Sequence, residues 1–350
     1  MTAAEARVDR VDRVDPVDPV DREPVLQVRD LHVTFSTGAG DARAVRGVDL
    51  DVFPGEALAV VGESGSGKSV TMLALLGLLR GARVTGSARY RGTELVGMDV
   101  ARLRQIRGAK VSMIFQDPMT SLNPVLTIGK QLGLVMRAHE PGMPKRIARA
   151  RAIELLDQVA ISQAARRCDS YPHELSGGMR QRVMIAMAIA NNPEVLIADE
   201  PTTALDVTVQ AQIMELLRDL QHEHHLALVL ITHDLGVVAG STDRVAVMYA
   251  GRVVETGAVD PLFGHPGHPY TRGLLACLPR LDERHDIQSS IPGIPTSPLS
   301  LPPGCPFAPR CSYAEAACTD AEPALAPHHQ TLAACFVTTR VAADQEVTAP

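Results

Sequence analysis

Aromatic residues are scarce in this sequence: they make up 3% of its 350 residues, and tryptophan is absent. A folded core must therefore consist mainly of aliphatic side chains, and the apolar content of 45% is ordinary for a globular protein. An excess of positive charge is also lacking, because the formal net charge is −6. Proteins that bind nucleic acids usually carry a basic face, so we expect no nucleic-acid partner.

Long hydrophobic segments are missing as well. No apolar run approaches the roughly 20 residues that a membrane-spanning helix needs, and the longest runs, near residues 73–79 and 226–231, have the length of core elements. The first residues lack the apolar region of a signal peptide. We therefore expect a cytosolic protein, and in the cytosol clustered cysteines indicate metal or redox chemistry more often than disulfides.

The chain begins with a low-complexity segment, residues 1–24, in which Val-Asp pairs repeat with Arg or Pro. The charge and proline content of this segment predict a disordered tail. From Val25 onward, short β-branched runs alternate with helical patterns, which predicts an α/β fold with a mostly parallel sheet.

Three further divisions follow from the pattern. The first strands after Val25 predict an antiparallel β flank, and a mainly helical stretch at about 117–180 predicts an inserted helical subdomain. The composition becomes rich in proline after Gly264. We therefore divide the folded part into a segment at 25–265 and a smaller C-terminal domain at 266–340, followed by a flexible tail at 341–350.

The segment "GESGSGKS" matches the phosphate-binding pattern G-x-x-x-x-G-K-[ST] in full. It lies between a predicted strand and a predicted helix, so its backbone N–H groups and the helix N-terminus can surround phosphate oxygens. We expect Lys68 to reach the β- and γ-phosphates of a nucleotide and Ser69 to bind Mg²⁺. The residues expected to contact the nucleotide here are Gly62, Glu63, Ser64, Gly65, Ser66, Gly67, Lys68, Ser69 and Val70.

Two acidic residues follow the predicted buried strand in "EVLIADE". Asp199 suits the Mg²⁺ shell of a nucleotide site. Glu200, one residue further, can orient or deprotonate an attacking water molecule. The alternative, an ordinary acidic pair at a strand end, is weakened by the phosphate-binding loop upstream.

The segment "LSGGMRQR" offers a second anion-binding helix N-terminus. One nucleoside triphosphate does not need two such termini from the same chain. Two chains arranged head to tail would use both, with each nucleotide held between the phosphate loop of one chain and this segment of the other.

With these motifs, the sequence resembles the ATPase cassette of ABC transporters. The family signature corresponds to Leu175, Ser176, Gly177, Gly178 and Gln181, and further family motifs to Gln116 in "MIFQDP", Asp206 in "ALD" and His233 in "ITHD". The resemblance implies ATP and Mg²⁺ as ligands, with His233 at the γ-phosphate and Gln116 linking Mg²⁺ and the attacking water to a membrane subunit. It implies catalytic roles for Lys68, Gln116, Glu200 and His233. Phe35 resembles the aromatic residue that stacks on adenine, although a core position is the other interpretation.

Three stretches resemble a narrower branch, the ATPases of oligopeptide and dipeptide importers. They are "QDPMTSLNP", "HPYTRGLLACLP" and "IPGIP" followed by "LPPGCPFAPRC". This resemblance implies a peripheral protein at the cytoplasmic face of the membrane that powers peptide uptake. It implies two membrane permease subunits, a second ATPase chain and an extracytoplasmic solute-binding protein as partners. Import of nickel or another small solute is the alternative, and an ATPase acting on nucleic acid or ribosomes is disfavoured by the acidic charge and the single cassette.

Four of the six cysteines lie near the C-terminus: Cys305, Cys311, Cys318 and Cys335. Four thiols suffice for an iron–sulfur cluster or a zinc site, but the spacing lacks the C-x₂-C element usual in structural zinc sites. Four unrelated small buried residues are the simpler interpretation of the spacing. The resemblance to peptide-importer ATPases implies a [4Fe–4S] cluster on these four cysteines. Cys168 and Cys277 lie outside this group.

Overall fold

The computed structural model describes residues 23–203, 205–278 and 291–341, so residues 1–22 and 342–350 of the predicted tails lie outside it. The molecule is organised around an eight-stranded sheet in the order β11-β12-β10-β9-β3-β8-β7-β6. The five strands from β9 to β6 are parallel, while β10, β12 and β11 are antiparallel. The strands of this sheet are β3 (Ala57–Val61), β6 (Val111–Ile114), β7 (Val195–Asp199), β8 (Ala227–Thr232), β9 (Arg244–Tyr249), β10 (Arg252–Ala258), β11 (Ala326–His328) and β12 (Thr331–Ala333).

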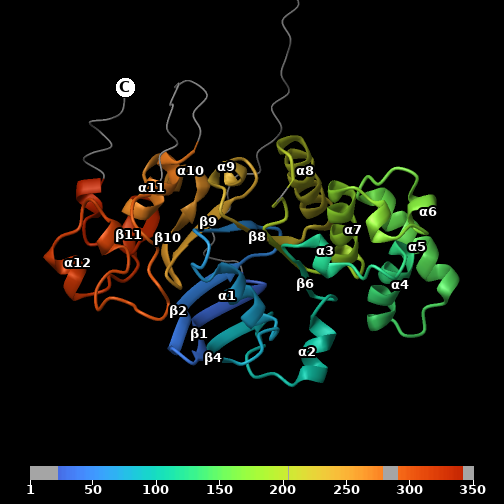
Figure 1. Cartoon of the computed structure of the whole chain (residues 1–350), viewed down its shortest axis with the longest axis horizontal. Helices are drawn as coiled ribbons and strands as arrows, with labels where there is room; N and C mark the ends of the chain where they lie inside the picture. Colours follow the sequence, from blue (N-terminus) through green and yellow to red (C-terminus); the bar gives the residue numbers. More distant parts are fainter. Residues whose placement is uncertain (1–22, 204, 279–290, 342–350) are drawn as a thin grey trace, which may run out of the picture.

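A second sheet forms the antiparallel flank, with strands in the order β2-β1-β4-β5. These are β1 (Leu26–Thr37), β2 (Gly40–Val52), β4 (Ala82–Tyr90) and β5 (Thr93–Glu94). The alternating apolar residues of β1 bury one face of this sheet against the main body, and its polar residues face solvent. Figure 1 shows the flank below the main sheet. The predicted α/β class, with a mostly parallel sheet and an antiparallel flank, is confirmed.

Two groups of helices complete the fold. The first is inserted between β6 and β7 and comprises α3 (Pro118–Ser121), α4 (Ile128–His139), α5 (Lys145–Gln158), α6 (Ala164–Arg167), the 3₁₀ turn η2 (Pro172–Glu174) and α7 (Gly177–Ile189). The second lies outside this insertion and comprises α1 (Lys68–Leu75), α2 (Val100–Ile106), α8 (Val207–His224), α9 (Leu235–Val238), α10 (Val259–Gly264), α11 (Pro269–Ala276), η3 (Ala308–Arg310) and α12 (Ala316–Asp320). Within the described ranges, none of the helices has the length and apolarity required to span a bilayer.

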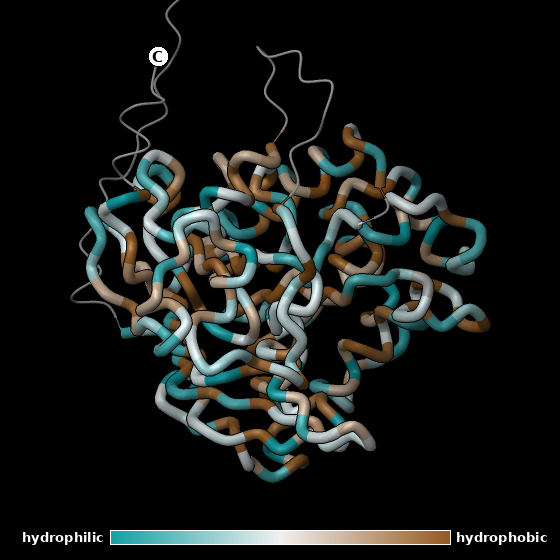
Figure 2. The backbone as a smooth tube through the Cα atoms, turned by 60° about the vertical axis from the view of Figure 1, so that its left-hand side comes forward, coloured by the Kyte–Doolittle hydropathy of each residue, from teal (hydrophilic) through white to brown (hydrophobic). Residues whose placement is uncertain are grey.

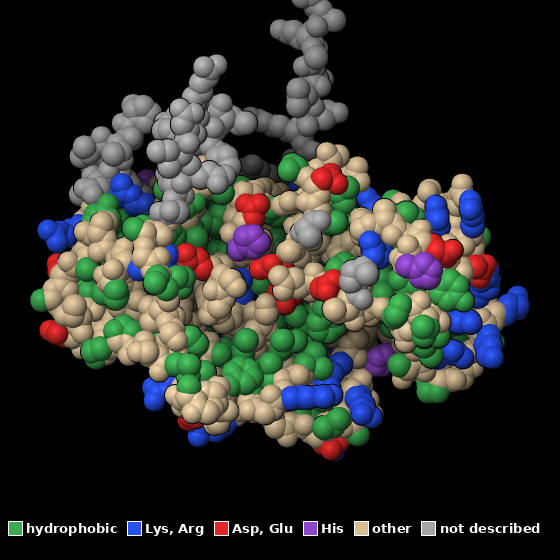
Figure 3. Space-filling view, viewed as in Figure 1, with side chains coloured by type: hydrophobic (Ala, Val, Ile, Leu, Met, Phe, Trp, Pro, Cys, Tyr) green, Lys and Arg blue, Asp and Glu red, His purple; other side chains and the backbone are tan. Residues whose placement is uncertain are grey.

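The inserted helices and the C-terminal segment lie at opposite ends of the molecule (Figure 1). Basic residues gather over the inserted helices (Figure 3), where α5 alone has the sequence KRIARARAIELLDQ. Because β11 and β12 continue the eight-stranded sheet beyond β10, the C-terminal segment is part of the main sheet. We call residues 266–278 and 291–341 the C-terminal extension.

The core is aliphatic, as the composition predicts, and the parallel strands are covered on both faces. In β8, Leu228 and Leu230 belong to the cluster that includes the inserted helices. Val229 and Ile231 belong to the cluster beneath the antiparallel flank. This alternation is the two-residue period of a strand whose faces both pack against other layers, and Figure 2 shows the hydrophobic segments gathered inside the molecule.

A core substitution tests this arrangement. Leu230 is 0% exposed at the centre of the sheet, so Leu230→Ala should lower the free energy of unfolding by about 3 kcal/mol through lost burial and a residual cavity. Urea denaturation followed by circular dichroism measures the change. Val207→Ala is the control, because Val207 is 83% exposed at the start of α8; equal losses for the two variants would contradict the assigned core.

Candidate functional site

The loop between β3 and α1 has a backbone that requires glycine at two positions. Gly62 has φ 150° and Gly67 has φ 103°. A Cβ atom on Gly62 would lie 2.2 Å from the carbonyl oxygen of Met248, and one on Gly67 would lie 2.6 Å from that of Ala44. Side chains are excluded at both positions, so the loop turns tightly and α1 begins directly behind it at Lys68.

Lys68 is folded back over this loop. Its Nζ donates hydrogen bonds to the carbonyl oxygens of Gly62 (2.7 Å) and Glu63 (3.0 Å). Burial lowers the pKa of the Lys68 ammonium, while Glu200, Asp199 and Glu63 oppose that shift. The ammonium therefore lies against the backbone of the loop and close to three acidic residues. A polyanion bound to the loop would contact it there.

A hydrogen bond joins the start of α1 to the end of β7. The Oγ of Ser69 donates to Oδ1 of Asp199 at 2.8 Å. Asp199 is buried, and burial raises its pKa, partly offset by the bond from Ser69. A hydroxyl and a carboxylate oxygen side by side are suitable ligands for a hard cation such as Mg²⁺.

Glu200 connects three neighbouring parallel strands, because Gln116 follows β6, Glu200 follows β7 and His233 follows β8. Its Oε2 accepts hydrogen bonds from Nε2 of Gln116 (2.7 Å) and Oγ1 of Thr203 (2.9 Å). Its Oε1 lies 3.2 Å from Nδ1 of His233. Ligand sites of open α/β sheets form at such carboxyl edges.

The surroundings of the Glu200 carboxyl group favour its ionised form. Burial by itself would raise its pKa, but the hydrogen bonds from Thr203 and His233 and the nearby charge of Lys68 bring the pKa below its usual value. Glu200 also has φ 46°, in the left-handed region that a glutamate rarely occupies. A strained backbone and a lowered pKa at one carboxylate are features of functional positions.

The segment at Ser176 forms a second, separate feature. Ser176 caps α7, with its Oγ accepting from the N–H of Met179 at 3.3 Å. Ser176 and Gly177 are exposed, so the N-terminus of this 13-residue helix is open to solvent. A Cβ on Gly178 would lie 2.8 Å from Val209, and Asp206 caps the helix that carries Val209.

Two residues that were predicted to contact the nucleotide, Gln181 and Phe35, do not lie at the exposed surface formed by Ser176 and Gly177. Gln181 is 2% exposed, and its Nε2 has no hydrogen-bond partner among the described residues. The structure therefore does not bring Gln181 to the surface that Ser176 and Gly177 form. Phe35 is partly exposed on β1 and packs against the core cluster beneath the flank.

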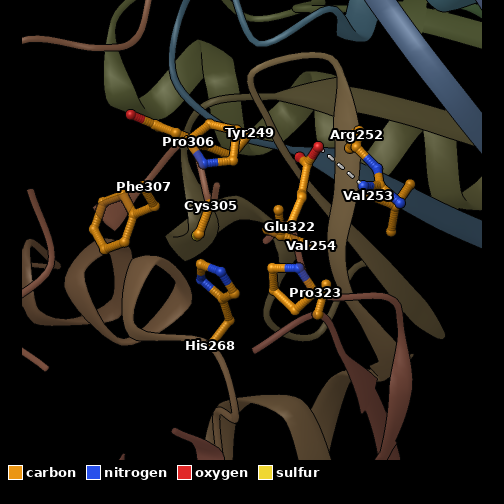
Figure 4. A pocket seen from close by; sticks show the side chains of 11 residues that line it. Tyr249, Arg252, Val253, Val254, His268, Cys305, Pro306, Phe307, Glu322 and Pro323 are labelled. Atoms are coloured by element: carbon orange, nitrogen blue, oxygen red, sulfur yellow. Dashed lines mark ion pairs between the residues drawn. The ribbon is translucent and has the colours of Figure 1, made fainter. Parts of the chain in front are cut away.

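The four C-terminal cysteines line one cavity together with His268, Phe307 and Val337. All four are free thiols. Burial raises the pKa of the Cys305, Cys311 and Cys335 thiols, that of Cys335 to about 12. Figure 4 shows Cys305 beside His268 and Phe307 in the adjoining pocket.

These thiols are not arranged around a single ion. Within the described ranges, His, Cys, Asp and Glu side chains form no group of three or more that could hold a metal ion. The geometry thus gives no support to a mononuclear zinc site. The predicted [4Fe–4S] cluster stays a prediction, because a cavity with four free thiols supplies the correct number and type of donor but shows no metal-binding arrangement.

Sequence reasoning missed three residues near the phosphate loop. Thr203 bonds to Glu200, and two residues of the C-terminal extension, Tyr270 and Arg310, contact Glu63. No motif marks Tyr270 or Arg310 as a neighbour of the loop. Their contacts join residues 207 and 247 positions apart in the chain.

Similarity to known protein families and to individual relatives agrees with this geometry. The chain matches the ABC transporter family over residues 45–203 and the family described as the C-terminal region of oligopeptide/dipeptide transporters over residues 254–318. It is 56% identical over 302 residues to a putative peptide import ATP-binding protein of Brucella abortus, covering 86% of this chain and 91% of the relative. It is 52% identical to the oligopeptide transport ATP-binding protein OppD of Salmonella typhimurium, covering 89% and 93%.

A solved structure supports the same assignment. A dimeric ATP-binding cassette in a post-hydrolysis state, bound to ADP and Pi, is 31% identical with a TM-score of 0.61. The similarity covers 67% of this chain and 98% of that one. The predicted resemblance is thereby confirmed: the chain belongs to the ABC transporter ATPase family, in the branch that carries the oligopeptide/dipeptide transporter C-terminal region.

Proposed function

We propose that this ABC ATPase powers uptake of dipeptides or oligopeptides through a membrane importer. The named functions of its relatives from Brucella and Salmonella support a peptide as the solute. The proposed assembly contains two membrane permease subunits, a second ATPase chain and an extracytoplasmic solute-binding protein. In it, the chain lies peripherally at the cytoplasmic face of the membrane.

The observation that carries ATP hydrolysis is the convergence of the ends of β3, β7 and β8 on one edge of the sheet. Lys68 and Ser69 follow β3, Asp199 ends β7, Glu200 follows it, and His233 follows β8. We assign Lys68 to the β- and γ-phosphates, together with the N–H groups of the glycine-rich loop. Ser69, Asp199 and Gln116 would hold Mg²⁺, which neutralises phosphate charge when bound.

Glu200 is assigned as the group that orients and deprotonates the attacking water. Its carboxylate accepts the proton as the water oxygen bonds to the γ-phosphorus and the bond to the bridging oxygen breaks. Gln116 and His233 support this role because both contact the Glu200 carboxylate. His233 is also placed to face the γ-phosphate.

The segment at Ser176, Gly177 and Gly178, of which the first two residues are exposed, is proposed to complete the site of a second ATPase chain. An open helix N-terminus with a serine hydroxyl attracts anions, and this one belongs to a helix of 13 residues. The related cassette bound to ADP and Pi is dimeric. Asp206, which caps α8 beside this segment, is proposed to lie at the same dimer interface.

We further propose that Cys305, Cys311, Cys318 and Cys335 hold a [4Fe–4S] cluster. Their placement around one cavity supports this proposal, since a cluster accepts thiolates over a wider span than a single ion does. The cluster would tie the η3 turn, α12 and the segment after β12 together. In a small region with few other core residues, such cross-linking stabilises the fold.

Replacement of Glu200 tests the catalytic assignment. In the chain purified with its permease subunits, Glu200→Gln should lower ATP turnover at least about 100-fold while ATP binding is retained, because the amide cannot accept the proton. Phosphate release and binding of a fluorescent ATP analogue measure the two effects. Glu215→Gln, an exposed residue of α8, is the control; full turnover by Glu200→Gln would exclude the assigned base.

Metal analysis tests the cluster. Protein purified without oxygen should show an absorbance band at about 400 nm and about four irons per chain. Cys311→Ser should lose both signals, whereas Cys277→Ser, outside the cavity, should keep them. Colourless protein that contains zinc instead of iron would contradict the proposal.

A further inference from the structure

Arg310 of the C-terminal extension forms an ion pair with Glu63, the second residue of the phosphate-binding loop. Its guanidinium forms two parallel bonds to the Glu63 carboxylate, with Nη1–Oε2 at 2.6 Å and Nη2–Oε1 at 2.9 Å. The Arg310 side chain is 3% exposed and that of Glu63 is 27% exposed, so the guanidinium of this bidentate ion pair is shielded from water while the carboxylate is partly exposed. An interaction of this kind is stronger than a surface ion pair and fixes the direction of both partners.

The position of Arg310 is determined by its own surroundings. Its Nε donates to the carbonyl oxygen of Pro292 (2.9 Å) and its Nη2 to that of Ile291 (3.2 Å). The guanidinium carbon lies 5.9 Å from the ring centre of Tyr249 and 5.8 Å from that of Phe307. The two hydrogen bonds and the two ring contacts together fix the position of the guanidinium.

The extension also holds the backbone of Glu63. The Glu63 N–H donates to the hydroxyl oxygen of Tyr270 at 2.7 Å. Tyr270 is fully buried on α11, and its ring packs against Tyr249 and Phe307. The main chain and the carboxylate of Glu63 are thus both fixed by residues more than 200 positions away in the sequence.

The consequence concerns Lys68, which is five residues further along the loop. Its ammonium already bonds to the Glu63 carbonyl oxygen and lies close enough to feel the charge of Glu63. A Glu63 carboxylate released from Arg310 could turn toward this ammonium and pair with it. It would then compete with the phosphates of a nucleotide for the same cation and repel them.

We propose that Arg310 is a positioning residue of the nucleotide site, which keeps the Glu63 carboxylate away from Lys68 so that the ammonium is available to phosphate. This inference rests on the proposed role of Lys68. It makes the C-terminal extension part of the ATPase site, with Arg310 acting on Lys68 through Glu63. The effect belongs to nucleotide binding and not to the chemical step.

The test uses the full chain with its permease subunits. Arg310→Met should raise the KM for ATP, and the Kd of a fluorescent ATP analogue, about tenfold with kcat changed less than about twofold, because one competing charge is released near the phosphates. Adding Glu63→Gln to Arg310→Met should restore both values to within about threefold of the wild type. The amide has no charge with which to pair Lys68.

A matched control is available in the same extension. Arg272 donates to the Tyr313 hydroxyl at 2.8 Å and lies over that ring, and among the residues that the structure describes, its side-chain hydrogen bonds stay within the extension. Arg272→Met should therefore leave the KM for ATP unchanged even where it lowers the melting temperature. A shared rise in KM for both arginine variants would show a general effect of a loosened extension and overturn the proposal.

Other outcomes are equally decisive. An unchanged KM in Arg310→Met, or a raised KM that Glu63→Gln does not relieve, contradicts the proposal while wild-type activity leaves the ATPase assignment intact. A wild-type complex that does not hydrolyse ATP contradicts the proposed function instead. Where Arg310→Met does not fold, Arg310→Lys is the alternative variant, because lysine keeps the positive charge but cannot form two parallel hydrogen bonds to a carboxylate. Arg310→Lys should give a smaller rise in the KM for ATP, which Glu63→Gln again relieves.

Discussion

The parallel pairing of β3 with β8 and of β8 with β7 is the constraint on which the nucleotide site depends. Each strand ends at the same edge of the sheet, so residues that follow separate strands meet in space. The Ser69–Asp199 bond and the contact between His233 and Glu200 exist only because these registers align the strand ends. A shift of one residue would also turn every core side chain of the strand to the opposite layer.

The hydrophobic layers explain why that register is stable. Residues of β8 alternate between two core clusters. Residues 58–61 of β3 and 245–249 of β9 alternate between the cluster under the flank and a third cluster. The third cluster contains Tyr270 and Phe307 of the extension together with Val61 and Tyr249. Three buried aromatic side chains, Tyr249, Tyr270 and Phe307, thus lie together where the extension meets the phosphate-binding strand.

The sequence predicted those parts of the fold and site that depend on short-range patterns. The loop at Gly62–Ser69 was predictable because its glycines and lysine act within eight residues. Asp199 and Glu200 were predictable because the first ends a buried strand and the second follows it directly. Thr203, Tyr270 and Arg310 were not predictable, since each acts through a side chain placed by tertiary packing. Spacing alone likewise could not show that four cysteines separated by up to 30 positions line one cavity, nor that Gln181 would be buried.

The continuation of the main sheet through β12 and β11 has a consequence for exchanging parts between related ATPases. Because β10 pairs with β9 on one side and with β12 on the other, it belongs structurally to both halves of the chain. A chimera joined near residue 265 would pair β10 of one parent with β12 of another, so the side chains that face each other across this pair would come from different sequences. A joint at that position therefore divides two strands that pair with each other, whereas an exchange of the extension that includes β10 keeps this pair within one parent.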